Sequence, residues 1–271
     1  MCAWFNIGRA ERDDKELCGI IKRICSLLSA MMMLLCNEAA ARYHHKPWPD
    51  DVPSPQYINV APLPGAGIAL NEQGDPDGLG AFQINIPVAY TPRNGYLSLS
   101  AYKGKHPNDP GLETDNGTGV FALAFGNNPS LYASAMQVSS ILSESKALSF
   151  QLSVIRETPK HPALAVGIQD LLEKEPRMQS LYFVTTKRFQ FVDRHLFATV
   201  GYGGGRFLDG PIAGVSTPLS ESTNLALEWD GYQINSGLGW RPGGRHGWLT
   251  LLGAYNGKTG WLFGGAIAFK L

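Results

Sequence analysis

The chain has 271 residues and no formal net charge, because 23 lysines and arginines balance 23 aspartates and glutamates. Charged residues make up 17% of the sequence, below the roughly 25% of ordinary soluble domains, and 31 residues are glycine. This balance indicates neither nucleic acid nor an acidic surface as a partner. Beyond the N-terminal region the sequence has no apolar run of about 18 residues, so a location in a membrane would require a closed β-barrel.

Residues 1–41 have the order of a secretory signal peptide. A basic pair, Lys22 and Arg23, precedes an apolar run over residues 24–35, and a run of alanines ending at Ala41 follows. All four cysteines precede the expected cleavage after Ala41, so the exported chain would hold no thiol. The alternative is a cytosolic protein whose N-terminal helix is apolar.

Residues 42–80 are rich in proline and glycine and are expected to form an extended leader, with room for a first strand within residues 57–70. From residue 81 to residue 271 we expect a β-barrel, because strand-like segments follow one another with turn residues between them. The first such segment is 82–88, in which large apolar residues alternate with glutamine, asparagine and proline.

The later segments repeat this pattern of period two, which is typical of β-strands. The clearest of them cover residues 148–154, 164–168, 196–202, 225–229 and 232–240, and an Asp-Gly pair at 230–231 predicts a hairpin. The last segment, 261–271, alternates most regularly and ends with the chain. Such an apolar terminal strand is typical of bacterial outer-membrane barrels.

Thirteen segments are recognised in all, whereas a bacterial single-chain barrel has an even number of strands. We therefore expect an antiparallel up-and-down barrel of 12–14 strands. If the C-terminus is periplasmic, the three longest linkers, residues 104–117, 171–179 and 203–210, all fall on the outer side. Short inner turns and longer outer loops are the usual arrangement in such barrels.

Period two alone does not separate a membrane barrel from a soluble β-protein, because both alternate large apolar and polar residues. Here the polar face is mainly glutamine, asparagine, serine and small residues, and aromatic residues lie near strand ends. Both features favour a transmembrane barrel in the bacterial outer membrane. A soluble periplasmic β-barrel that binds a ligand remains the alternative.

The alternation places a set of polar side chains inside the barrel. The lumen-lining candidates are Gln169, Arg188, Glu228, Asp230, Gln233, Asn235 and Arg241. Glu228 and Asp230 are a carboxylate pair of the kind that performs acid-base chemistry. They point to the polar face near Arg241, which lies at the far end of the next strand. We favour a salt-bridge network inside the lumen or an effect on ion preference.

The longest loop carries a second group of candidates. They are His106, Asp109, Glu113 and Asp115, which together could hold a cation or serve a hydrolytic site, although a solvated outer loop explains them better. A barrel enzyme acting on lipid or peptide would need a histidine such as His106 or His195 next to a nucleophile, and no such motif is recognised. No catalytic residue, metal or cofactor is expected.

Four stretches resemble a known family in order and spacing. They are VGIQD at 166–170, YFVTTKRF at 182–189, ATVGYGG at 198–204 and LEWDGYQINSGL at 227–238. Over residues 162–238 the chain resembles the YjbH-like family of exopolysaccharide-associated outer-membrane barrel proteins of Gram-negative bacteria. The resemblance implies a barrel linked to the secretion or organisation of surface polysaccharide, without known catalysis.

The sequence therefore predicts a non-enzymatic, integral outer-membrane protein. It would be a narrow pore or the membrane component of an envelope or exopolysaccharide-export system. The expected partners are outer-membrane lipid, the barrel assembly machinery, and polysaccharide or export-system proteins, and nucleic acid is not among them.

Overall fold

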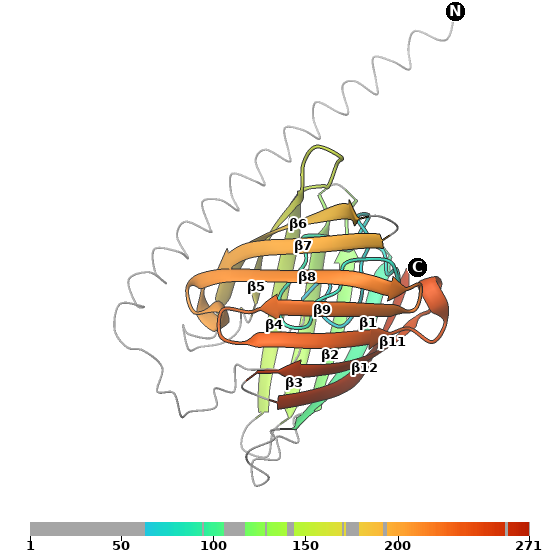
Figure 1. The fold of residues 1–271 in the computed structure, drawn as a ribbon. Helices are drawn as coiled ribbons and strands as arrows, with labels where there is room; N and C mark the ends of the chain where they lie inside the picture. Colours follow the sequence, from blue (N-terminus) through green and yellow to red (C-terminus); the bar gives the residue numbers. More distant parts are fainter. Residues whose placement is uncertain are drawn as a thin grey trace, which may run out of the picture. The chain divides into compact units, whose positions relative to one another are not determined.

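The computed structural model describes residues 63–93, 95–105, 117–127, 129–139, 144–169, 171, 179–191, 194–257 and 260–270. All of them belong to one compact unit, residues 53–271. They contain a closed antiparallel barrel of twelve strands (Figure 1). No helix in these ranges is long and apolar enough to cross a membrane.

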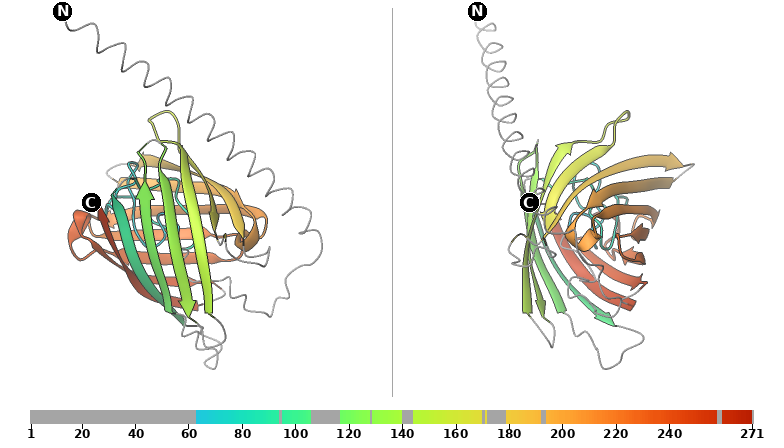
Figure 2. Two further views of the ribbon diagram at one scale, coloured as in Figure 1. Left: turned by 180° about the vertical axis from the view of Figure 1, so that it is seen from behind. Right: turned by 90° about the vertical axis from the view of Figure 1, so that its left-hand side faces the viewer.

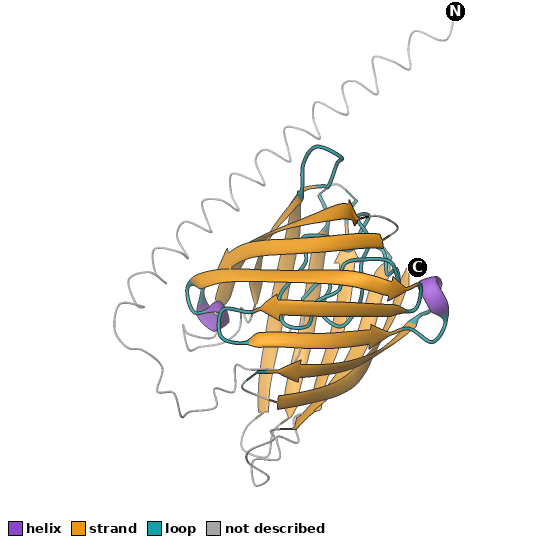
Figure 3. Cartoon of the chain, in the orientation of Figure 1, coloured by secondary structure: helices purple, strands orange, loops and turns teal. Residues whose placement is uncertain are grey.

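The strands follow one another around the barrel in sequence order, as an up-and-down topology requires. They are β1 (Tyr96–Lys105), β2 (Gly117–Phe125), β3 (Leu131–Ser139), β4 (Glu144–Ile155), β5 (Ala163–Gln169), β6 (Ser180–Phe191), β7 (Arg194–Gly203), β8 (Gly210–Ser220), β9 (Thr223–Trp229), β10 (Ile234–Trp240), β11 (Leu249–Asn256) and β12 (Gly260–Lys270). Two short 3-10 helices, η1 (Gly205–Phe207) and η2 (Gly244–His246), lie in connections (Figure 3). The expected all-β up-and-down barrel is confirmed, with twelve strands.

Strand β12 closes the barrel. It pairs antiparallel with β11 on one side and with β1 on the other, where Ile267 lies opposite Leu99. Because every strand then has two partners, the wall has no free edge, and its backbone donors and acceptors are satisfied within the sheet. The regular alternation of the last segment therefore corresponds to the strand that completes the wall.

The two ends of the barrel are distinguished by their connections. At the end called here the terminal rim, β1 begins at Tyr96 and β12 ends at Lys270, and the β2–β3, β4–β5, β6–β7, β8–β9 and β10–β11 connections lie there. The strand ends joined by the β1–β2, β3–β4, β5–β6, β7–β8, β9–β10 and β11–β12 connections lie at the other end, called here the distal rim. The strand ends that flank the three longest linkers expected from the sequence are therefore all at the distal rim.

The strands present one face to the lumen and the other to the outside. In β9, for example, Asn224, Ala226 and Glu228 are buried inside, whereas Leu225 and Leu227 are exposed on the outer wall. Successive side chains of a strand point to opposite faces of a sheet, so the period-two pattern becomes an inner and an outer surface. The outer surface is apolar, and polar side chains are concentrated inside.

One expected strand is absent from the wall. The prediction that residues 82–88 form a barrel strand is wrong, and the first strand begins at Tyr96 and not at residue 81. Residues 80–92 are buried throughout and lie within the lumen as irregular chain with isolated bridges, such as Ala66 to Gln83. This extra segment explains why thirteen segments are recognised in a barrel of twelve strands. The signal peptide lies outside the described residues.

Candidate functional site: the filled lumen

Residues 63–93, called here the inner segment, occupy the interior of the barrel. Figure 2 shows this segment enclosed by the curved wall. Five of its large apolar side chains have no exposed surface: Leu70, Phe82, Ile84, Ile86 and Val88. Burial on all sides provides the hydrophobic stabilisation that a water-filled lumen would lack. Residues 42–80 are expected from the sequence to form an extended leader, but the described part of that range, residues 63–80, belongs to the core of the protein.

Towards the distal rim, Glu228 of β9 holds the backbone of the inner segment. Its Oε2 accepts a hydrogen bond from the Ile84 N–H at 2.9 Å, and its Oε1 accepts one from the Asn85 N–H at 2.6 Å. The side-chain amide of Asn235 donates to Glu228 Oε1 at 3.1 Å and to Asp230 Oδ2 at 2.9 Å. The two carboxyl groups therefore accept hydrogen bonds from buried backbone and amide donors.

Asp230, in the β9–β10 turn, adds to the hydrogen bonds of Glu228, and the two residues together are called here the distal anchor. Its Oδ1 accepts hydrogen bonds from the N–H groups of Tyr232 and Gln233, and its Oδ2 accepts a longer one from Asn85 at 3.3 Å. An aspartate that bonds backbone two and three residues ahead stabilises a turn. The Asp-Gly turn predicted from the sequence is thus confirmed between β9 and β10, and it also contacts the inner segment.

At the terminal rim, Asp77 of the inner segment forms a bidentate ion pair with Arg245. Arg245 Nη2 lies 2.9 Å from Asp77 Oδ2, and Arg245 Nε donates to Oδ1 at 2.9 Å. Burial alone would raise the pKa of Asp77, but hydrogen bonds from Arg245 and from the Leu79 N–H, together with the charge of Arg245, lower this pKa below its ordinary value. Asp77 is therefore ionised near neutral pH.

The backbone next to Asp77 is tied to the same rim. The Gly78 N–H donates to the Arg245 carbonyl at 2.8 Å, and the Gly78 carbonyl accepts a hydrogen bond from Asn224 at 2.9 Å. Arg241, which is buried, donates to the Arg245 carbonyl at 3.0 Å. The η2 connection is thus held against the inner segment by both side-chain and backbone contacts.

Further ion pairs hold the inner segment at this rim. Arg188 Nη1 lies 2.9 Å from Glu72 Oε1, and Lys270 Nζ lies 2.8 Å from Asp75 Oδ2. The hydroxyl of Tyr90 donates to Glu157 of the β4–β5 connection. Exposed pairs of this kind contribute only about 0–1 kcal/mol each, so they position the segment more than they stabilise it.

Between the two rims, polar side chains of the wall bond to the backbone of the inner segment. Ser216 accepts the Phe82 N–H at 3.1 Å, Thr186 accepts the Ala89 N–H at 2.8 Å, and Gln151 donates to the Val88 carbonyl at 3.0 Å. Irregular chain in a closed lumen needs such partners, because a buried backbone group without one is costly. The polar inner face is therefore matched to a peptide segment.

Small residues of the wall make room for the large side chains of the inner segment. A Cβ atom added at Gly237 would lie 2.7 Å from Ile84 Cδ1, and one at Gly239 would lie 2.9 Å from the Phe82 ring. Both distances are shorter than ordinary van der Waals contact. The small residues on the inner face of the strands thus leave space for the large apolar side chains of the inner segment.

The sequence-predicted lumen residues fall into different parts of this arrangement. Gln169, Glu228, Asp230, Gln233, Asn235 and Arg241 are buried, whereas Arg188 lies at the terminal rim with a side chain that is 40% exposed. The salt-bridge network expected from the sequence does not include Arg241. Within the described ranges no ion pair joins Glu228 or Asp230 to Arg241, which lies at the opposite rim. His106, Asp109, Glu113 and Asp115 lie outside the described residues.

A polar cavity of about 130 Å³ lies beside the inner segment at the terminal rim. It is lined by Asn71, Glu72, Gln73, Asp77, Leu79, Arg188, His195 and Arg245. His195 Nδ1 is buried without a hydrogen-bond partner. None of these lining residues carries a hydroxyl or a thiol, so this cavity does not offer His195 a serine or cysteine nucleophile.

Sequence reasoning missed the inner segment and its rim anchor, Asp77 with Arg245. The only signal for the segment was the odd count of alternating stretches, since its own alternation imitates a strand. No local signal marks the ion pair, whose members are 168 residues apart. No group of three or more potential metal ligands occurs in the described part of the chain.

Comparison with known proteins assigns no family to this barrel. No family model matches the chain, and no curated protein is detectably similar to it.

Proposed function

We propose that this protein is an integral outer-membrane β-barrel whose lumen is occupied by its own inner segment. The observation that carries the proposal is the outer wall, where large apolar side chains encircle a closed barrel. Leu225, Leu227, Leu238 and Leu251 lie in its middle part and are all 39% or more exposed. A soluble monomer seldom exposes so much contiguous apolar surface, whereas a bilayer solvates it.

Exposed aromatic residues on the outer wall add a second argument. Towards the distal rim they are Tyr202, Trp229, Tyr255 and Trp261, with Phe183 stacked on Tyr202 and Phe263 stacked on Trp261. Towards the terminal rim they are Phe125, Phe189, Trp240, Trp248 and Phe269, and among the described residues Phe121, in the middle of β2, is the exception to this division. Two aromatic bands separated by an aliphatic one are the usual pattern of outer-membrane barrels, in which aromatic rings lie at the two membrane interfaces. The pattern supports insertion over a soluble β-barrel that binds a ligand.

Within the membrane, we propose that the barrel is a component of an envelope or exopolysaccharide-export system and not an open diffusion pore. The filled lumen argues against free passage of solutes while the inner segment is in place. The link to polysaccharide rests on the resemblance of residues 162–238 to YjbH-like proteins. No catalytic role is proposed.

The first test is fractionation of cells that produce the full chain. An integral barrel stays in the outer-membrane pellet after carbonate extraction, and it migrates faster on a detergent gel when it is not boiled. A protein released by carbonate, with no heat-dependent shift, would overturn the membrane assignment and favour the soluble alternative.

Two further measurements separate the functional roles. In planar bilayers the purified barrel is expected to show no large steady conductance, and an open pore of stable high conductance would refute the plugged state. Deleting the gene is expected to lower the amount of surface or secreted polysaccharide, and unchanged polysaccharide would remove the export role while leaving the membrane assignment intact.

A further inference from the structure

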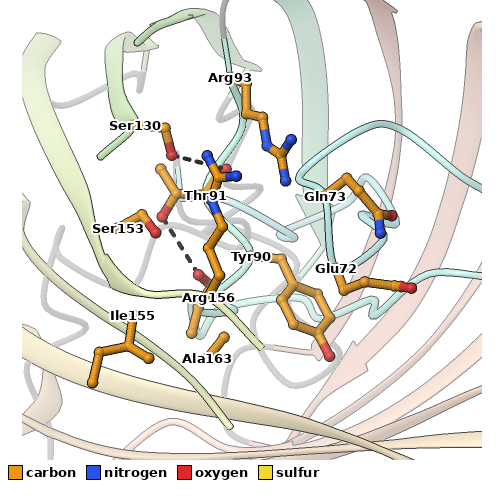
Figure 4. A pocket seen from close by; sticks show the side chains of 11 residues that line it. Glu72, Gln73, Tyr90, Thr91, Arg93, Ser130, Ser153, Ile155, Arg156 and Ala163 are labelled. Carbon is orange, nitrogen blue, oxygen red and sulfur yellow. Dashed lines mark hydrogen bonds between the residues drawn. The ribbon is translucent and has the colours of Figure 1, made fainter. Parts of the chain in front are cut away.

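Two arginines converge at the terminal rim from separate parts of the chain. Arg93 ends the inner segment, and Arg156 follows β4. Arg93 Nη1 lies 3.4 Å from Asn127 Oδ1, and Arg156 Nη2 lies 3.2 Å from the same oxygen. Two guanidinium groups therefore share one neutral amide oxygen, and Figure 4 shows both extending into the hollow beside Thr91.

The nearby carboxylates do not neutralise these two arginines. Glu72 pairs with Arg188 at 2.9 Å, and Glu157 pairs with Lys187 at 3.2 Å. Among the described residues neither Arg93 nor Arg156 forms an ion pair. Burial, together with the neighbouring charge of Arg93, lowers the pKa of Arg156. Two like charges are thus held together without a counter-charge.

The surroundings of the two guanidinium groups are polar. The hollow has a volume of only about 10 Å³, and its lining includes the hydroxyl-bearing residues Thr91, Ser130 and Ser153 together with Glu72, whose carboxylate pairs with Arg188 (Figure 4). Exposed apolar side chains, Val154 and Ile155, lie on the strand that leads to Arg156. The site therefore lies where the apolar outer wall ends and polar groups begin.

We propose that Arg93 and Arg156 form a binding site for a phosphate group. A guanidinium presents its N–H donors as a planar fork that fits the oxygens of an oxyanion, and two forks match the several oxygens and the charge of one phosphate. The phosphate oxygen would take the place of Asn127 Oδ1 between the two groups. The source of the phosphate is either the headgroup of a membrane phospholipid or a phosphate compound in solution. Only the lipid source rests on the membrane location proposed above.

The site is tested with the folded full chain in a neutral detergent and inorganic phosphate as the probe, by calorimetric titration at low ionic strength. The variant with Arg93→Gln and Arg156→Gln is expected to bind phosphate about tenfold or more weakly, because both charge-assisted contacts are lost. Lys160→Gln is the matched control, since Lys160 is an exposed cation of the same connection. It is expected to stay within about twofold of the unmodified protein.

The shape of the site is tested separately from its charge by Arg156→Lys. This variant keeps the positive charge but loses the fork, and it is expected to bind more weakly than the unmodified protein. A heat-dependent gel shift shows that each variant is folded. Equal phosphate affinity in the double variant and the unmodified protein would overturn the site. An equal loss of phosphate affinity in Lys160→Gln would also overturn it, because the loss would then reflect the overall positive charge of this rim.

The source of the phosphate is decided with lipid. The protein is reconstituted in vesicles of phosphatidylglycerol and phosphatidylcholine, and retained phosphatidylglycerol is counted by native mass spectrometry. Loss of retained lipid in the double variant, but not in Lys160→Gln, assigns the site to a headgroup. Retained lipid that is equal in all variants, together with selective loss of inorganic phosphate binding, assigns it to a soluble phosphate. If the double variant and the unmodified protein retain the same amount of phosphatidylglycerol and also bind inorganic phosphate with the same affinity, the proposal is refuted.

Discussion

Replacement of Glu228 tests whether the wall holds the inner segment by hydrogen bonds to its backbone. Glu228→Ala removes the acceptors of the Ile84 and Asn85 N–H groups, at 2.9 and 2.6 Å, and both groups are buried. A buried donor left without a partner costs about 1–3 kcal/mol, so the two together predict a loss of about 2–6 kcal/mol in the free energy of unfolding. Glu228→Gln keeps one acceptor and is expected to lose about 1–3 kcal/mol.

The assay is equilibrium urea unfolding of the barrel in lipid vesicles, followed by tryptophan fluorescence, with planar-bilayer conductance as a second measurement. Ser216→Ala is the matched control, because it removes only the acceptor of the Phe82 N–H and is expected to cost about 1–2 kcal/mol. Glu228→Ala is also expected to produce intermittent conductance, since the inner segment loses its distal anchor. If Glu228→Ala costs no more than Ser216→Ala and conductance is unchanged, the assignment of Glu228 as an anchor is refuted.

Three other changes probe the rim, the wall and the outer surface. Asp77→Asn is expected to destabilise the protein by about 1–2 kcal/mol at neutral pH through loss of the bidentate pair with Arg245. The pKa of Asp77 is lowered in the folded state, so this stabilisation is fully present above the ordinary carboxyl pKa and is lost as the pH falls through the lowered pKa of Asp77. In unfolding measurements at decreasing pH, the difference in unfolding free energy between the variant and the unmodified protein should therefore vanish in acid. Gly237→Val places a Cβ 2.7 Å from Ile84 and is expected to lower the free energy of unfolding by about 1–3 kcal/mol. Gly253→Ala is the control and should be tolerated, because its Cβ would lie 3.8 Å from Phe263. Equal urea midpoints for the two variants would contradict the close packing of Gly237 against Ile84. Leu225→Arg on the outer wall is expected to cost about 2–4 kcal/mol in a bilayer, and a change within about 0.5 kcal/mol in unfolding measurements would indicate that this surface faces water.

Much of the wall could be predicted from the sequence, because a strand with one polar and one apolar face has polar and apolar residues that alternate along the sequence. The segment at 225–229 became β9, with Glu228 inside and Leu227 outside, and the last segment became β12. The Asp-Gly pair marked a real turn for a local reason, since the conformation of a turn depends on the few residues that form it. Burial of Asn235 and Gln233 likewise followed from alternation alone.

Tertiary structure alone decided what fills the barrel. Residues 82–88 alternate as convincingly as a true strand, yet β1 and β12 pair with each other and leave no edge for another strand. The same local pattern is therefore compatible with a place in the wall or a place inside it, and closure of the sheet selects between them. The partners of Asp77 and Glu228 were also undetermined by sequence, since each contact joins residues more than 140 positions apart. Period two is a property of neighbouring residues, whereas the choice of partner depends on which distant surfaces the closed barrel brings together.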